Sequence, residues 1–187
     1  MPRSKKVNLN NQVEDKGRCR QTVIDNVKMK IHFHGMSILN ALLRKIKHHD
    51  TVYIMGCCAW LTNKRIIQAM GSNLKGVSII CTKDKITMAK STQAKYRLLK
   101  PLQEGTSPIN YIGAGRGFNR SLMHHKFLVG LDAAKQPLWC STGSFNLTTS
   151  AVNHLENCMV IENVAVAAAF KEEFIRLYPL SRPLKIK

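Results

Sequence analysis

Short apolar segments typical of strands alternate with amphipathic segments typical of helices along the first half of this chain. The segment VKMKIHFH (27–34) alternates apolar and polar residues, which predicts a strand. SILNALLRKIKHH (37–49) then places its apolar residues at helical spacing. TVYIMGCCAWL (51–61) and GVSIICTK (76–83) are apolar and contain β-branched residues, as buried strands do. The region between these two strands has the pattern of a short helix.

The second half of the chain replaces this alternation with a hairpin. A helix is predicted at 86–102 and a short strand at 110–115, which enters a glycine-rich turn. Two strands joined by the turn DAAKQP follow, and a short helix, a strand and a closing amphipathic helix complete the pattern (122–131, 138–143, 144–153, 155–162 and 164–178). Strand–helix alternation followed by a hairpin predicts an α/β fold, with a mixed central β-sheet flanked by helices.

The N-terminal residues lack this patterning. Residues 1–24 are basic and polar, and we interpret them as a flexible N-terminal arm, whereas residues 25–187 are long enough to form one domain. The basic start is not followed by an apolar stretch, so a signal peptide is not predicted. Because no apolar run of about 18 residues occurs, we expect no integral membrane association and a cytoplasmic location.

The charge of the chain is strongly one-sided. Lysine and arginine total 29 against 11 acidic residues, which gives a net charge of +18. An excess of this size is typical of proteins with a polyanionic partner, either nucleic acid or an anionic membrane surface. The alternative interpretation is a surface whose charge only keeps the protein in solution.

The six cysteines predict neither a disulfide framework nor a zinc site. They include no C-x-x-C pair, and several lie in strand-like apolar segments, so buried reduced thiols are the favoured interpretation. Histidine and cysteine residues show no recurring metal-ligand spacing. We therefore expect no metal and no cofactor.

The first residues that suggest chemistry are His124 and Lys126, in the segment LMHHKFLVGL. If this segment is a strand, both lie on one face and His125 lies on the other. An imidazole beside an ammonium suits a phosphate diester, because the imidazole can attack phosphorus and the ammonium can neutralise the charged oxygens. The alternative is that His124 is structural, as a lone histidine in a strand more often is.

A second group of polar residues follows. Ser144 and Asn146 can donate hydrogen bonds to phosphoryl oxygens, and Gly143 allows close approach of the backbone to a substrate. Glu156 could accept a hydrogen bond from the second ring nitrogen of His124 and so fix its tautomer. Taken singly, a GSxN segment is more often a turn or a helix cap, and a glutamate at the start of a strand is more often solvated.

Taken together, these residues have the order of a known signature. The segment MHHKFLVGLDAAKQPLWCSTGSFNLTTSAVNHLENCMVI closely resembles the phospholipase D superfamily motif, H-x-K-x4-D-x6-G-S-x-N. The similarity is strongest over residues 122–162, and weaker similarity extends back to about residue 36. The resemblance implies a phospholipase D-like fold and a phosphodiesterase chemistry that needs no metal.

The resemblance also assigns roles to individual residues. It implies that His124 is a nucleophile that forms a phosphohistidine, that Lys126, Ser144 and Asn146 bind phosphate, and that Glu156 orients His124. The sequence departs from the motif at the aspartate. Five residues, not four, separate Lys126 from the next acidic residue, at position 132. We interpret the turn that begins there as an extension particular to this chain.

The chain contains one copy of the motif. A two-step displacement also needs a group that protonates the leaving oxygen and then activates water. In the superfamily this group is the histidine of a second copy, and no other histidine here is followed two residues later by lysine. The chain resembles the small single-motif bacterial nucleases, so a homodimer with His124 of both subunits at one phosphate is expected. The alternative is that His124 acts slowly, with water alone.

Several further residues are candidates for contact with a nucleic acid. Arg116 and Arg120, in GAGRGFNR, could bind flanking phosphates, or they could be exposed residues of a connector. Phe145 lies within the motif and could contact a base or a sugar. Of the two tryptophans, we interpret Trp60 as a core residue, whereas Trp139 could be either core or site.

Three features favour a nuclease among these possibilities: the single motif, the charge of +18 and the absence of a membrane segment. We therefore expect an endonuclease that cleaves DNA or RNA and binds it with strong salt dependence. One alternative is a phospholipid hydrolase at an anionic membrane, for which SILNALLRKIKHH is the closest candidate interfacial helix. Another is a nucleic-acid-binding module with an idle site, which the intact set of motif residues disfavours.

Overall fold

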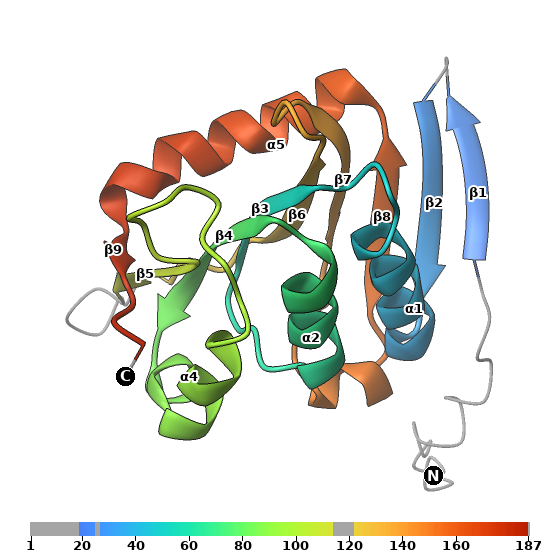
Figure 1. The fold of residues 1–187 in the computed structure, drawn as a ribbon. Helices are drawn as coiled ribbons and strands as arrows, with labels where there is room; N and C mark the ends of the chain where they lie inside the picture. The colour runs from blue at the N-terminus through green and yellow to red at the C-terminus, as the bar shows by residue number, and fades with distance from the viewer. Residues whose placement is uncertain (1–18, 25–26, 114–121, 187) are drawn as a thin grey trace, which may run out of the picture.

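A nine-stranded sheet with helices on both faces forms the body of the molecule (Figure 1). The computed structural model describes residues 19–24, 27–113 and 122–186. Within these residues the strand order is β1-β2-β8-β7-β6-β3-β4-β5-β9. Strands β3, β4 and β5 are parallel, and all other neighbours are antiparallel. The predicted α/β class, with a mixed central sheet flanked by helices, is confirmed.

The strands are β1 (Cys19–Ile24), β2 (Val27–Phe33), β3 (Tyr53–Cys58), β4 (Gly76–Lys83), β5 (Ile109–Gly113), β6 (Lys126–Leu131), β7 (Pro137–Gly143), β8 (Asn157–Glu162) and β9 (Arg182–Pro183). The α-helices are α1 (Gly35–Ile46), α2 (Lys64–Asn73), α3 (Lys85–Met88), α4 (Lys90–Tyr96) and α5 (Val164–Leu177). Two short 3-10 helices are η2 (Ser150–Asn153) and η3 (Tyr178–Leu180).

The helices form two layers. Helices α1, α2 and α4 cover one face of the sheet, and α5 covers the other (Figure 1). The side chains of Leu42 and Ile67 belong to the core on the first face, whereas Val129 and Phe174 belong to the core on the second. Alternating residues of the central strands supply both cores, which is why these strands are apolar throughout.

Strand direction divides the loops between two ends of the sheet. Strands β3, β4 and β7 end, and β6 and β8 begin, at the end that lies lowest in Figure 1, called the lower end from here on. The opposite, upper end carries the turn between α1 and β3 and the turn between β6 and β7. Residues far apart in the sequence therefore meet at the lower end.

Some predicted boundaries differ from the structure. The helix predicted at 86–102 is two short helices, because Ala89 is extended, with φ −63° and ψ 134°. The strand predicted at 122–131 begins only at Lys126. In place of a helix at 144–153 there is only η2.

The N-terminal boundary also differs. Residues 19–24, assigned to the arm, form β1, because their backbone pairs with residues 27–32 of β2. The rest of the predicted arm lies outside the described residues. Among the helices of the described ranges, none has both the length and the hydropathy needed to cross a bilayer.

Candidate active site

His124 and Lys126 lie side by side at the lower end of the sheet. His124 is exposed and precedes β6, and Lys126 is the first residue of that strand. The Lys126 Nζ atom is 3.1 Å from Nδ1 and 3.2 Å from Nε2 of His124, and it donates to the His124 carbonyl oxygen at 2.9 Å. Burial lowers the pKa of Lys126, although the nearby charge of Glu156 opposes this shift. An imidazole and an ammonium are thus adjacent, as the motif predicted.

Ser144 and Glu156 form a second pair at this end. The Ser144 hydroxyl donates to the Glu156 carboxylate and accepts from the Asn157 backbone N–H at 3.0 Å. The Ser144 N–H in turn donates to the Asn157 carbonyl oxygen at 3.0 Å. Gly143 precedes this contact, where a Cβ atom would lie 2.2 Å from the same carbonyl oxygen. The glycine of the motif is therefore required by the close approach of β7 to β8.

Asn146 follows in the loop after β7. Its side chain is half-buried, and its Oδ1 atom is buried without a hydrogen-bond partner in the described part of the chain. The next residue, Leu147, accepts hydrogen bonds from the backbone N–H groups of Thr62 and Asn63, at 2.9 and 3.0 Å. This loop is therefore tied to the chain that leaves β3, which fixes the backbone that carries Asn146.

The Glu156 carboxylate contacts other residues of this end of the sheet. Among the described residues it binds Ser144, and its Oε1 atom lies 4.0 Å from His154 Nδ1. A hydrogen bond between Glu156 and His124 is not among the contacts of these residues. The ring that contacts His124 is instead Trp60, with ring centroids 5.9 Å apart and ring planes at 82°.

Trp60 is thus a site residue that sequence reasoning assigned to the core. It is half-buried, two residues beyond the end of β3. Its Nε1–H donates to a carboxylate oxygen of Asp84, which follows β4. The position of Trp60 in the sequence could have indicated this role, because residues just after the carboxyl ends of parallel strands commonly form sites in α/β folds.

The remaining candidate residues have different outcomes. Phe145 is 3% exposed and belongs to the main core, so its ring cannot reach a base in this structure. Trp139 is buried at the upper end, where its Nε1–H donates to Thr51 Oγ1 at 3.0 Å. Arg116 and Arg120 lie outside the described residues.

Asp132 shapes the hairpin turn at the upper end. Its carboxylate accepts from the Gln136 N–H at 2.8 Å, and its N–H donates to the Gln136 carbonyl oxygen at 3.0 Å. Its carbonyl oxygen accepts from the N–H of Lys135, which has a φ of 60°. Asp132 therefore lies at the opposite end of β6 from His124.

Buried thiols lie beneath the lower end. Cys58, opposite Lys126 in the β3–β6 ladder, has its Sγ atom 4.0 Å from that of Cys81. The hydrogen bond to Cys81, together with burial, raises the pKa of Cys58 well above its ordinary value. The structure describes five cysteines as buried and free, which confirms the prediction for these residues.

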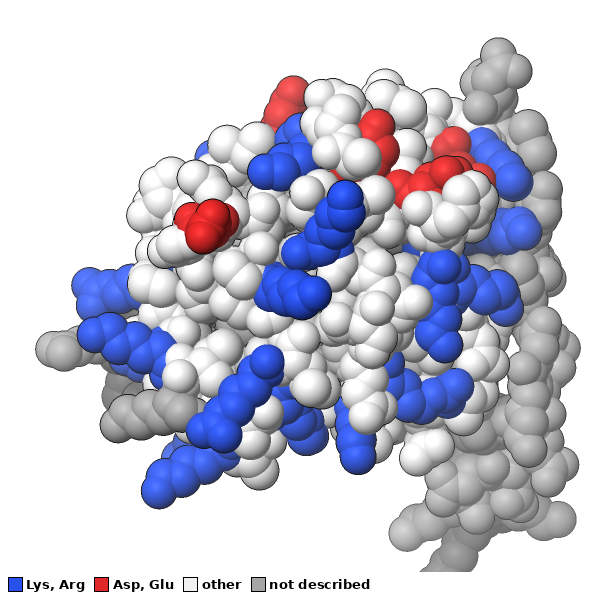
Figure 2. Space-filling view, in the orientation of Figure 1, with Lys and Arg blue, Asp and Glu red and all other residues white. Residues whose placement is uncertain are grey.

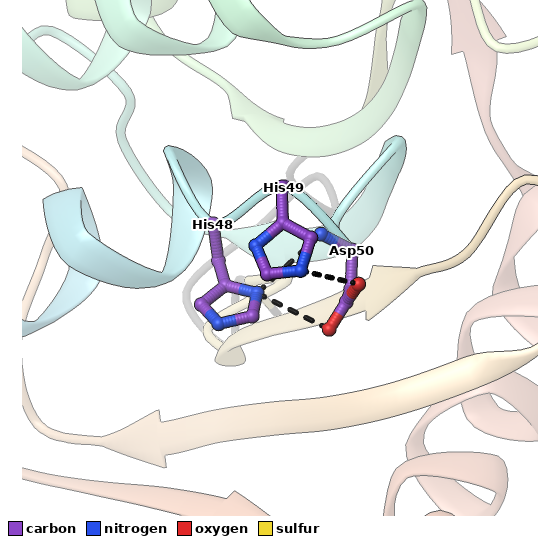
Figure 3. Close-up of side chains that lie close together, drawn as sticks. All are labelled: His48, His49 and Asp50. Carbon is purple, nitrogen blue, oxygen red and sulfur yellow. Dashed lines mark hydrogen bonds and ion pairs between the residues drawn. The ribbon is translucent and has the colours of Figure 1, made fainter.

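One cluster in the described ranges has side chains that could ligate a metal ion. His48, His49 and Asp50 form the turn between α1 and β3, and their ligand atoms lie within 4.8 Å of one another. Both imidazoles point toward the same carboxylate (Figure 3). This exposed cluster is at the upper end, so its residues cannot hold a metal for a reaction at His124.

The charges of the lower end are mostly unpaired cations. Lys64 and Arg65 begin α2, and Lys85 and Lys90 begin α3 and α4; all four side chains are exposed. None of the four forms an ion pair with a carboxylate of the described residues. Figure 2 shows Lys and Arg side chains over the lower part of this face, whereas Asp and Glu lie mainly along its top. The site thus lies in a positive field that attracts anions.

The fold and the site define a class of protein. Residues 42–178 match the family described as "Cardiolipin synthase, PLD-like domain". The match covers more than half of the chain, so the chain belongs to the phospholipase D-like family, a group of phosphodiesterases. The predicted membership of the phospholipase D superfamily is therefore confirmed.

Individual relatives are more distant. An uncharacterized protein of Acanthamoeba polyphaga mimivirus is 26% identical over 168 residues, covering 70% of this chain and 59% of that protein. The chain thus spans less than two-thirds of the length of this relative.

Solved structures share the fold. NucT from Helicobacter pylori has a TM-score of 0.68 at 15% identity, covering 84% of this chain and 99% of NucT. Nuc from Salmonella typhimurium, a phospholipase D family member, has a TM-score of 0.62 at 18% identity, covering 85% and 99%. A phosphatidylserine synthase from Haemophilus influenzae has a TM-score of 0.57 at 15% identity, covering 88% of this chain and 42% of the synthase. At such identities the likeness shows the fold alone.

Proposed function

We propose that this protein is a metal-independent nuclease that cleaves phosphodiester bonds of DNA or RNA, with His124 as its nucleophile. The observation that carries the proposal is the grouping of His124, Lys126, Ser144 and Glu156 at one end of the sheet, with unpaired cations around it. An exposed imidazole beside a partly desolvated ammonium can attack a phosphodiester and stabilise the charge that develops.

The reaction proceeds in two displacements. In the first, a ring nitrogen of His124 forms a bond to phosphorus while the bond from phosphorus to the leaving oxygen breaks, and an acid group gives that oxygen a proton. In the second, the conjugate base of the acid takes a proton from water as the water oxygen bonds to phosphorus. The bond between phosphorus and the ring nitrogen breaks, which restores His124. Lys126, Ser144 and Asn146 hold the non-bridging oxygens in both steps.

A second histidine is needed as the acid, and we assign it to His124 of a partner subunit in a homodimer. Within the described part of one chain, His125 contacts Glu173 at 3.3 Å, on the side of α5. His154, at 4.0 Å from Glu156, is the alternative acid within the same chain. A dimer brings two equivalent imidazoles to one phosphate, as a two-fold axis through the site requires.

The charge distribution supports a nucleic acid as substrate. Exposed cations at the starts of α2, α3 and α4 can bind phosphates on either side of the scissile bond, as a polymer substrate offers. An anionic membrane surface would also attract these cations, so the panel of substrates below includes vesicles. Buried free thiols support a reducing compartment such as the cytoplasm as the setting.

The test is a panel of substrates in excess chelator. Plasmid, single-stranded DNA, RNA and vesicles containing anionic phospholipid are each incubated with the protein in EDTA. Cleavage of a nucleic acid that persists in EDTA is the expected result. Quenching with detergent at alkaline pH, which preserves the acid-labile bond between nitrogen and phosphorus, should trap the phosphoryl group on His124. Loss of cleavage on chelation would contradict the metal-free mechanism. Hydrolysis of the vesicles alone would assign the site to lipids.

The dimer has its own test. Light scattering should give twice the mass of one chain at concentrations where the protein cleaves. A His154→Gln variant should remain active if the partner supplies the acid. An active monomer, inactivated by His154→Gln, would transfer the acid role to His154 of the same chain.

A further inference from the structure

His124, Trp60 and Asp84 lie next to the ends of three neighbouring strands at the lower end of the sheet. Strand β6 lies beside β3, and β3 lies beside β4. His124 precedes β6, whereas Trp60 and Asp84 follow β3 and β4. The chain just after β3 is also joined to the end of β4, because the Thr82 N–H donates to the Ala59 carbonyl oxygen at 3.1 Å. The order of the three side chains therefore follows from the order of the strands.

The Trp60 ring is held in one orientation. Its Nε1–H donates to one carboxylate oxygen of Asp84, and the other accepts from the Thr87 N–H at 2.8 Å, as the N-cap of α3. The Asp84 carbonyl oxygen accepts from the Met88 N–H at 3.0 Å. Because the carboxylate is fixed by the helix that it caps, the indole ring that it binds is fixed as well.

The His124 ring, by contrast, has few restraints of its own. It is exposed and lies before the first ladder pair of β6, and Glu156 is engaged with Ser144. Lys126 approaches both ring nitrogens, so its contacts do not select one of them. The perpendicular packing of Trp60, at 5.9 Å between centroids, is the contact in the described residues that restricts rotation of the ring.

We propose that Trp60, fixed by Asp84, is a positioning residue that holds the His124 ring for attack on phosphorus. This inference rests on the proposed function, in which His124 is the nucleophile. The pair does not touch the reacting atoms. The contact with Trp60 restricts the orientation of the imidazole before attack and while the ring carries phosphate. Loss of this contact should therefore lower kcat and have little effect on substrate binding.

Kinetic variants test the ring contact. Trp60→Ala should lower kcat by about 10²-fold with a smaller change in KM, since misplacement of a reacting group by about 1 Å costs this much. Trp60→Phe keeps an aromatic ring but loses the Nε1–H, so a loss of about tenfold or less is expected. Trp139→Phe is the matched control at the upper end and should leave kcat unchanged. An unchanged kcat in Trp60→Ala would overturn the proposal.

A double-mutant cycle separates positioning from a structural role of Asp84. Asp84→Asn keeps a good N-cap for α3 and weakens the charge-assisted hydrogen bond to Trp60. It should lower kcat in the wild type and have no further effect in Trp60→Phe, because Asp84 acts through the indole N–H. Equal effects in both backgrounds would mean that Asp84 acts through α3, and the proposed tether would be wrong.

Fluorescence tests the contact without relying on cleavage. In Trp139→Phe, Trp60 is the one remaining tryptophan of the chain. Because the His124 ring packs against the indole, His124→Asn in that background should increase the quenching of the indole emission by acrylamide. Equal quenching in the two proteins would refute the contact. Greater quenching in the variant of a protein that has no nuclease activity would refute the proposed function and keep the contact.

Discussion

The two ends of the sheet use charged residues in opposite ways. At the upper end, Glu162 is paired with Lys28 at 3.2 Å and with Lys45 at 2.7 Å. At the lower end, the exposed cations that begin α2, α3 and α4 have no carboxylate partner in the described ranges, and burial lowers the pKa of Lys126. Paired charges are typical of a surface without a charged ligand. Unpaired cations attract an anionic partner, although they repel one another.

The strongest test of this contrast compares two adjacent histidines. His124→Ala should lower the cleavage rate by at least about 10³-fold, because the nucleophile is removed. His125→Ala should have little effect, since His125 points to Glu173 and α5. Initial rates on plasmid DNA in EDTA, with circular dichroism to check folding, measure both. Equal losses in the two variants would mean that the site has been assigned to the wrong face.

The next effect concerns Lys126. Lys126→Gln should lower kcat by about 10²-fold to 10³-fold, the usual result of removing one group that stabilises transition-state charge. Burial lowers the pKa of Lys126 below 10.5, the value of an ordinary lysine. The wild type should therefore lose activity at high pH, and this loss should begin at a lower pH than an ordinary lysine would give. Lys126→Arg keeps its charge to higher pH, so its alkaline limb should lie above that of the wild type. If the two proteins lose activity over the same alkaline pH range, another group limits the rate at high pH.

A smaller effect is expected from the unpaired cations. Replacing Lys64 and Arg65 together by glutamine should reduce the slope of log K against log salt by up to about 1.8, if each binds one phosphate. Replacing Lys47 and Lys75, two exposed cations near the upper end, gives the same net charge and should change the slope less. Fluorescence anisotropy with a labelled oligonucleotide measures the slopes. Equal slopes in the two double variants would show that net charge alone decides binding.

The smallest effect belongs to the paired charges. Burial opposes the charge of Glu162, but the hydrogen bonds and charges of Lys45 and Lys28 outweigh it and lower the pKa below 4.5. Glu162→Gln should therefore reduce the free energy of unfolding at neutral pH by about 1 kcal/mol or less, as expected for partly exposed pairs. A lowered pKa gives stability that is present above the unfolded value and lost as pH falls through the folded one. Urea unfolding should thus separate the two proteins at about pH 7 and not at about pH 2.

Cleavage by Glu162→Gln should match the wild type, because the residue lies at the opposite end of β8 from the site. A loss of cleavage at full folding would show that the two ends are coupled, and the contrast between them would have to be revised.

Local patterning was sufficient for the central strands. The β-branched, apolar run of β4 was predicted at its observed bounds, Gly76–Lys83. It was insufficient for the helical pattern of 86–102, which is interrupted at Ala89 and ends early, at Tyr96. Tyr96 is fully buried, and its hydroxyl donates to the Leu61 carbonyl oxygen at 2.8 Å, a tertiary contact that the local pattern does not show. The start of β6 at Lys126, rather than at 122, depends likewise on pairing with Cys58.

The site shows the same division. The sequence by itself determined the residue types and their order, from His124 and Lys126 to Ser144 and Glu156, because the chemistry of a phosphodiester requires these groups and the motif keeps them in one hairpin region. Only the tertiary structure decided their partners. It binds Glu156 to Ser144, buries Phe145 in the core, and brings Trp60 to His124 from a different strand. Such contacts depend on which strands are neighbours in the sheet, and no local pattern encodes that order.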